Sequence, residues 1–133
     1  MASCIVDTSI WIDFFRGTLP HAVHAMLTHH IEWRLAAITN VIRNEILVGA
    51  KDKQAFLTLR RLLAVLPLLY IAPDRGDAFD EFAWMLMRSG HRGKYTDVAI
   101  AFLCHEHQLP LLTSDRYFYH LAKKGVVKLV DLR

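Results

Sequence analysis

The chain has 133 residues, of which 53% are hydrophobic and 22% are charged, and its formal net charge is +3 with neutral histidines. This length and composition are typical of one globular domain with a substantial core, and they exclude a disordered chain. No apolar run approaches the roughly 20 residues that span a membrane, and the first residues lack the basic start of a signal peptide. We therefore expect a single cytoplasmic domain over residues 1–133.

The first half of the chain alternates between short apolar segments and helical patterns. Thr39 or Asn40 is a suitable N-cap for one of these helices. In chain order the pattern predicts a strand over 3–6, a helix from Asp7 to Gly17, a helix from His21, a strand over 35–38, a helix through Glu45 toward Gly49, and a helix over 51–66.

The second half continues the alternation after Pro67 breaks the preceding helix. Thr96 is the expected N-cap of the helix that contains Asp97. The predicted order is a strand over 68–72, a helix from Pro73 to about residue 88, a helix over 97–108, a strand over 110–113, a helix over 116–124 that ends at Gly125, and a strand over 126–130. Strands that alternate with helices predict a parallel sheet covered on both faces, with functional residues at the carboxyl ends of the strands.

Four acidic residues stand out in this pattern: Asp7, Glu45, Asp97 and Asp115. Asp7 and Asp115 each follow a predicted strand, while Glu45 and Asp97 lie beside apolar residues on their helices, so we expect both helical carboxylates to point inward. Each acid alone is compatible with a turn or a helix cap. Together, converging carboxylates repel one another, and a hard divalent cation such as Mg²⁺ or Mn²⁺ relieves that repulsion.

The chain resembles the PIN-domain nucleases, and more closely the VapC-type toxins of toxin–antitoxin pairs, in the segments VDTSIWIDFF, NEILVGA, YTDVAIAFLCHEHQLPLLTSD and RYF. The resemblance covers essentially the whole chain in order. It implies a PIN-like three-layer α/β/α fold, in which helices flank a central, mostly parallel sheet. It also implies a Mg²⁺- or Mn²⁺-dependent endoribonuclease.

The resemblance assigns roles to the acids. It implies that Asp7, Asp97 and Asp115 are the main metal ligands, directly or through water, and that Glu45 is a ligand or orients the attacking water. Two hydroxyl residues are candidates for holding these groups by hydrogen bonds, with local capping as an equal alternative: Ser9 and Thr113.

The resemblance further implies three partners: an RNA substrate such as a transfer or ribosomal RNA loop, a cognate antitoxin whose tail lies across the acidic groove, and a second copy in a homodimer. The segments IWIDFFRG and EFAWMLM are candidates for the dimer surface, or are simply core. Basic side chains near the acids are candidates for RNA contacts, or belong to a solvated loop: Arg88, His91, Arg92, Lys94, Arg16 and Arg116.

One alternative function remains open. A PIN-fold protein with a non-toxin RNA-processing role or a binding-only role would keep the same acids. Two other classes fit poorly. A phospho-acceptor receiver domain needs an acidic pair after its first strand, but here Asp7 is followed by Thr8 and Ser9. A haloacid-dehalogenase-type phosphatase needs a second Asp where this chain has Ser9. The paired histidines match no standard zinc spacing, and Cys4 and Cys104 are expected to be buried thiols.

Overall fold

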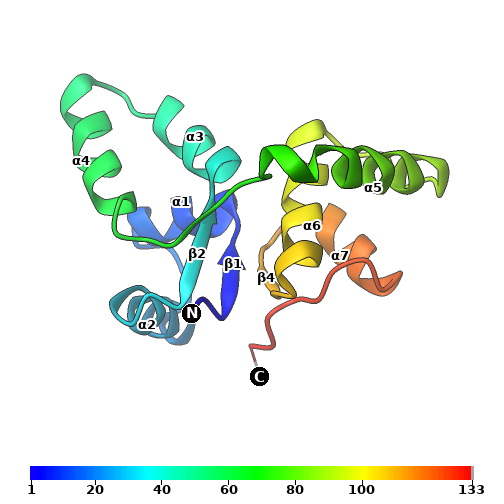
Figure 1. Cartoon of the computed structure of the whole chain (residues 1–133). Coiled ribbons are helices and arrows are strands. Elements are labelled where there is room, and N and C mark those ends of the chain that lie inside the picture. Colours follow the sequence, from blue (N-terminus) through cyan, green and yellow to red (C-terminus); the bar gives the residue numbers. More distant parts are fainter. Residues whose placement is uncertain (133) are drawn as a thin grey trace.

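The protein is described here by a computed structural model that covers residues 1–132. Its centre is a parallel sheet of four strands in the order β3-β2-β1-β4. Figure 1 labels three of them, β1, β2 and β4. The strands are β1 (Cys4–Val6), β2 (Ala36–Thr39), β3 (Leu68–Leu69) and β4 (Leu111–Leu112). In the register of the central strand, Cys4 pairs with Ala36 and Ile5 with Leu111.

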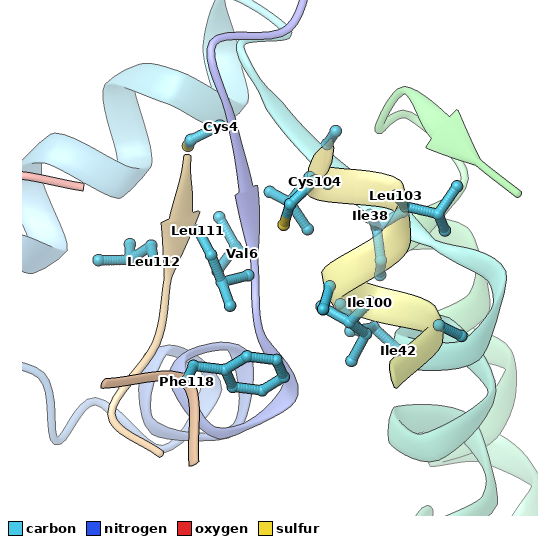
Figure 2. Packing of buried hydrophobic residues seen from close by; sticks show 14 of the residues in the cluster. Cys4, Val6, Ile38, Ile42, Ile100, Leu103, Cys104, Leu111, Leu112 and Phe118 are labelled. Carbon is cyan, nitrogen blue, oxygen red and sulfur yellow. The ribbon is translucent and has the colours of Figure 1, made fainter. Parts of the chain in front are cut away.

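Helices cover both faces of this sheet. They are α1 (Thr8–Arg16), α2 (His21–Glu32), α3 (Asn40–Val48), α4 (Lys53–Leu63), α5 (Gly76–Arg88), α6 (Tyr95–His107) and α7 (Arg116–Lys123), with the short 3₁₀ helix η1 (Pro73–Arg75) before α5. Helix α6, with Ile100 and Cys104, packs beside β1, which carries Val6 (Figure 2). The predicted three-layer α/β/α fold with a parallel central sheet is therefore confirmed.

Helix α6 forms the centre of the core. All seven residues from Val98 to Cys104 are buried, so the helix is apolar on every side. Ile100 and Cys104 lie on the side that faces the strands, and the fully buried Phe118 of α7 lies near the ends of β1 and β4 (Figure 2). Burial of about 25 cal/mol per Å² of apolar surface makes this packing the main stabilising term.

Side-chain caps begin three helices at or shortly after the carboxyl ends of strands. Asp7 accepts a hydrogen bond from the Thr8 amide and starts α1, and Thr39 accepts one from the Ile42 amide and starts α3. Asp115 accepts one from the Tyr117 amide and starts α7. The acids that follow β1 and β4 are thus fixed by the same turns that convert strand into helix.

Some predicted boundaries were wrong. The strand expected over 68–72 ends at Leu69. The strand expected over 126–130 is a single parallel bridge between Leu111 and Leu129, because the two-residue β4 offers too few backbone groups for a longer ladder. Thr96 does not cap α6, since the helix begins at Tyr95, two residues earlier than predicted, and its N-cap position, Lys94, makes no side-chain cap bond.

The two cysteines are buried and free, as predicted. Burial raises the pKa of the Cys4 thiol to about 11 and that of the Cys104 thiol to about 12. No helix within residues 1–132 is both long and apolar enough to cross a membrane.

Candidate functional site

Two of the four predicted acids meet at the carboxyl ends of the adjacent strands β1 and β4. The Thr113 hydroxyl connects them, because its Oγ1 donates to Asp7 Oδ2 at 2.7 Å and accepts a hydrogen bond from the Asp115 amide at 3.0 Å. The Thr8 amide donates to the other carboxylate oxygen of Asp7 at 2.8 Å. Asp7 is only 6% exposed, so the fold holds a carboxylate in a fixed position below the surface.

Electrostatic repulsion acts among the four acids. Burial raises the pKa of Asp7 above its usual 3.8, and the hydrogen bonds from Thr113 and Thr8 partly oppose this. The negative charges of Asp115 and Glu45 raise the pKa of Asp7 further. Burial likewise raises the pKa of Asp97, followed by the charges of Asp115 and Asp7. Each of these two pKa values is therefore raised in part by the charges of neighbouring acids from the same predicted set.

The acids differ in exposure. Asp97 is half-buried in the first turn of α6, as expected from its apolar neighbours. Glu45 is exposed, which corrects the prediction that its carboxylate points inward; its apolar neighbours on α3 are buried, but the Glu45 position lies just outside their stripe. The Thr8 hydroxyl donates to Glu45 Oε1 at 3.0 Å and so connects α3 to the turn that carries Asp7.

An open cavity of about 570 Å³ lies over Asp97 and Asp115. Its other lining residues are Arg92, Gly93, Lys94 and Tyr117. Glu45 lines a separate groove of about 300 Å³ together with Arg16. The acidic site is therefore bordered by basic residues on two sides.

The donor set suits a hard divalent cation. Within residues 1–132, no Lys or Arg forms an ion pair with any of the four acids, so the buried charge of Asp7 is not neutralised by the protein itself. In the same part of the chain, no three His, Cys, Asp or Glu side chains stand close enough to enclose an ion as they are, around the acids or around the paired histidines. Mg²⁺ typically uses one or two carboxylates and keeps several waters, so repelling carboxylates that line an open cavity fit it without a closed cage.

The structure separates the predicted RNA-contacting residues into two groups. Arg92 and Lys94 line the acidic cavity, and Arg16 lies in the Glu45 groove. These three are exposed long cations close to the acids, the arrangement expected of phosphate contacts.

The other three basic candidates have different surroundings. Arg88 lies on α5 with its guanidinium 5.3 Å from the centre of the Trp84 ring. The ring of His91 meets that of His120, with 3.1 Å between His91 Nδ1 and His120 Nε2. Arg116 is exposed at the start of α7 and does not line the cavity. Proximity in sequence to Asp97 or Asp115 therefore did not place these side chains in the cavity.

Of the two hydroxyl residues predicted to support the acids, only Thr113 binds one. Ser9 Oγ instead accepts a hydrogen bond from Ser114 Oγ at 3.1 Å. Sequence reasoning missed Thr8, whose hydroxyl holds Glu45, and Tyr117, which lines the cavity. Thr8 directly follows Asp7 as the first residue of a helix, which was an available signal, whereas nothing in the sequence marks Tyr117 as lining the cavity.

Comparison with known proteins places this geometry in a family. The sequence matches the PIN domain family over residues 4–124. No curated protein matches the chain significantly in sequence.

Several solved structures share the fold. A DNA-bound VapBC complex from Salmonella typhimurium contains a chain 16% identical with a TM-score of 0.78, covering 100% of both chains. A toxin–antitoxin complex from Klebsiella pneumoniae contains one 23% identical with a TM-score of 0.70, covering 98% of both. FitAcB from Neisseria gonorrhoeae contains one 15% identical with a TM-score of 0.71, covering 97% of both. At these identities the likeness establishes the shared fold alone.

Proposed function

Because the chain belongs to the PIN domain family, we propose that it is a Mg²⁺- or Mn²⁺-dependent endoribonuclease and the toxin of a VapC-type toxin–antitoxin pair. The observation that carries the proposal is the buried, unneutralised carboxylate of Asp7, held by Thr113 beside Asp115 and repelled by the neighbouring acids. A cluster that repels itself in the absence of a cation is suited to binding one. We treat residues 1–133 as one domain that carries this activity.

The residues of the chain have distinct tasks in this proposal. Asp7, Asp97 and Asp115 would hold the cation, which would supply Lewis-acid chemistry for polarising the scissile phosphate and activating a water. Glu45, exposed and held by Thr8, orients the attacking water from the α3 side. The hydrogen bond from Thr113 favours the ionised form of the Asp7 carboxylate and fixes its direction.

Basic residues on two sides of the acids would hold the RNA backbone. Arg92 and Lys94 border the cavity above Asp97, and Arg16 lies beside Glu45. A single-stranded RNA loop, such as one from transfer or ribosomal RNA, can place successive phosphates against both sides, which a rigid duplex does less readily.

Two observations support an antitoxin as protein partner. Structurally similar chains come from toxin–antitoxin complexes, and this chain has an exposed apolar groove. The groove has a volume of about 310 Å³ and lies between α1, α2 and α4. Phe15, Leu62 and Val65 line it and are 38%, 51% and 53% exposed. Such a groove suits the apolar face of a partner helix. Leu62→Glu should weaken binding of the protein encoded beside this gene, measured by calorimetry, whereas the same change at Val48, an exposed residue that does not line the groove, should not.

A homodimer would use the other candidate surface. Trp84 and Met85 of the EFAWMLM segment are 61% and 55% exposed on α5, which extends away from the sheet (Figure 1). In IWIDFFRG, by contrast, Ile10 and Trp11 are core residues. Met85→Glu should therefore convert the dimer to a monomer in sedimentation experiments if α5 forms the interface.

Cleavage of total RNA by the purified protein tests the proposed activity. The assay compares Mg²⁺, Mn²⁺ and EDTA, and the wild type with Asp7→Asn and Asp97→Asn. Asp52→Asn is the matched control, because Asp52 caps α4 through the Ala55 amide but lies outside the acidic site. Metal-dependent fragments that both site variants lose and the control keeps would support the proposal. A folded wild type that binds Mn²⁺ but cuts no RNA would favour a binding-only PIN protein.

A further inference from the structure

The loop formed by residues 89–94, between α5 and α6, is closely packed against α7. The Tyr117 ring lies directly on Gly93, so that a Cβ added at Gly93 would stand 2.5 Å from both Cζ and Oη of the tyrosine. Real side chains do not approach this closely, so only glycine allows the ring to occupy its place. The Tyr117 hydroxyl also donates to the His91 carbonyl at 3.1 Å. The Tyr117 side chain therefore contacts the loop at two places, at Gly93 and at the carbonyl of His91.

A second residue of the same helix face holds the loop as well. His120 follows Tyr117 by three residues, which places both on one side of α7. Its Nε2 lies 3.1 Å from His91 Nδ1, with 5.0 Å between the ring centres. The loop is thus attached through both the backbone and the side chain of His91.

These contacts fix the position of two cations at the acidic cavity. Arg92 and Lys94 are the neighbours of Gly93 in the chain, and both line the cavity together with Asp97 and Tyr117. Residues 91–94 have no regular secondary structure. Ordering such a segment costs backbone entropy, so its position depends on contacts of this kind.

We propose that Tyr117 is a positioning residue for RNA, which holds the 89–94 loop beside the acids so that Arg92 and Lys94 contact phosphates next to the cleaved bond. The packing of Tyr117 on Gly93 is the contact on which this depends. This inference rests on the proposed ribonuclease function and deepens it, since it assigns the RNA backbone a side of the cavity.

The salt dependence of RNA binding tests the inference. Labelled single-stranded oligouridine serves as the probe, and Ca²⁺ replaces Mg²⁺ so that binding is measured without cleavage. Each phosphate contact to single-stranded nucleic acid contributes about 0.7 to the slope of log K against log salt. Loss of two contacts should therefore lower the slope by about 1.4 and weaken binding about 25-fold at roughly 0.1 M salt.

Gly93→Ala and Tyr117→Ala should each show this loss, and Tyr117→Phe, which keeps the ring, should restore most of the slope. Gly76→Ala is the matched control, because a Cβ at Gly76 meets no atom within 4 Å. In a Tyr117→Ala background, Gly93→Ala should have no further effect, since the atoms it would meet are gone. With Mg²⁺, the Tyr117→Ala variant should cut RNA with a raised KM and a kcat within a few-fold of wild type.

The outcomes separate this inference from the proposed function. Wild-type slopes in Tyr117→Ala, or in a variant with Arg92→Gln and Lys94→Gln together, would overturn the positioning role while leaving the nuclease intact. Additive losses from Gly93→Ala and Tyr117→Ala would also overturn it. A wild type that neither cuts total RNA nor binds oligouridine would overturn both. Because the tyrosine variants only remove atoms, the test does not depend on Gly93→Ala folding.

Discussion

Replacement of Thr113 by valine should destabilise the protein in a way that depends on pH. Thr113 is 7% exposed, and its hydroxyl donates to the Asp7 carboxylate and accepts from the Asp115 amide. Valine has nearly the same shape but offers neither interaction. The change therefore leaves a buried carboxylate with one hydrogen bond in place of two.

The expected loss follows from the type of bond removed. A hydrogen bond to a charged group contributes about 1.5–3 kcal/mol, and the Asp115 amide, near the surface, regains much of its bond from water. We therefore expect the free energy of unfolding to fall by about 3 kcal/mol at neutral pH. At about 2.1 cal/mol/K per residue, unfolding of 133 residues has an entropy near 0.3 kcal/mol/K, so Tm should fall by about 10 °C.

The pH dependence is the sharper part of this prediction. The Thr113 hydroxyl stabilises the ionised form of Asp7, so its removal raises the pKa of that carboxyl further above 3.8. The loss is then largest at neutral pH and shrinks as the pH falls through the folded-state pKa and Asp7 becomes protonated. Combined with Asp7→Asn, which removes the charge, Thr113→Val should cost only about 1 kcal/mol.

Urea unfolding at about pH 7 and about pH 4 measures both effects. Thr39→Val is the control, because Thr39 is also buried at the end of a strand but its hydroxyl accepts from the Ile42 amide and contacts no acid. Its cost, about 1 kcal/mol for a lost N-cap, should change little with pH. Equal pH dependence of the two variants would refute the argument that Thr113 acts through the charge of Asp7.

Three further predictions follow from the site and the core. Since the folded-state pKa of Asp7 is raised, its charge destabilises the metal-free protein at neutral pH, and stability should increase as the pH falls through that pKa. In thermal melts without metal, Asp7→Asn should therefore raise Tm. Mn²⁺ at 100 times its Kd should stabilise the wild type by about 2.7 kcal/mol, and Asp7→Asn should abolish this gain. Thr8→Val frees the exposed Glu45 side chain, and should lower kcat about 10-fold in the RNA cleavage assay while Tm changes by less than about 3 °C. Cys4 and Cys104, with pKa values of about 11 and 12, should not react with a thiol reagent near pH 8 until the protein is unfolded; rapid labelling of the native protein would show that one of them is accessible.

The parts of the fold that depend on patterns of apolar residues were predictable from the sequence. Buried strands and the apolar stripe around Asp97 have few alternatives, and the carboxyl ends of neighbouring parallel strands meet by topology. The sequence pattern alone therefore predicts that Asp7 and Asp115 lie together. Their hydrogen-bonded connection through Thr113 then follows from the short turns after β1 and β4.

The parts that depend on local geometry were not predictable in the same way. Whether residues 126–130 form a strand depends on the length of β4, which is set by the turns around it. The exposure of Glu45 depends on how far α3 is rotated about its own axis. The spacing of apolar residues fixes that rotation too coarsely to tell whether Glu45 lies inside the buried stripe or just outside it. The contact between Gly93 and Tyr117 joins residues 24 positions apart in the sequence with no shared pattern.

The position of β1 between β2 and β4 has a consequence for protein synthesis. The bond from Thr113 to Asp7 joins residues separated by 106 positions. At about 5–20 residues per second, a ribosome adds Thr113 roughly 5–20 seconds after Asp7, and the interval cannot be shortened by fast local folding. A growing chain thus carries Asp7 for most of its synthesis without β4 and Thr113, the parts of the fold that complete its surroundings.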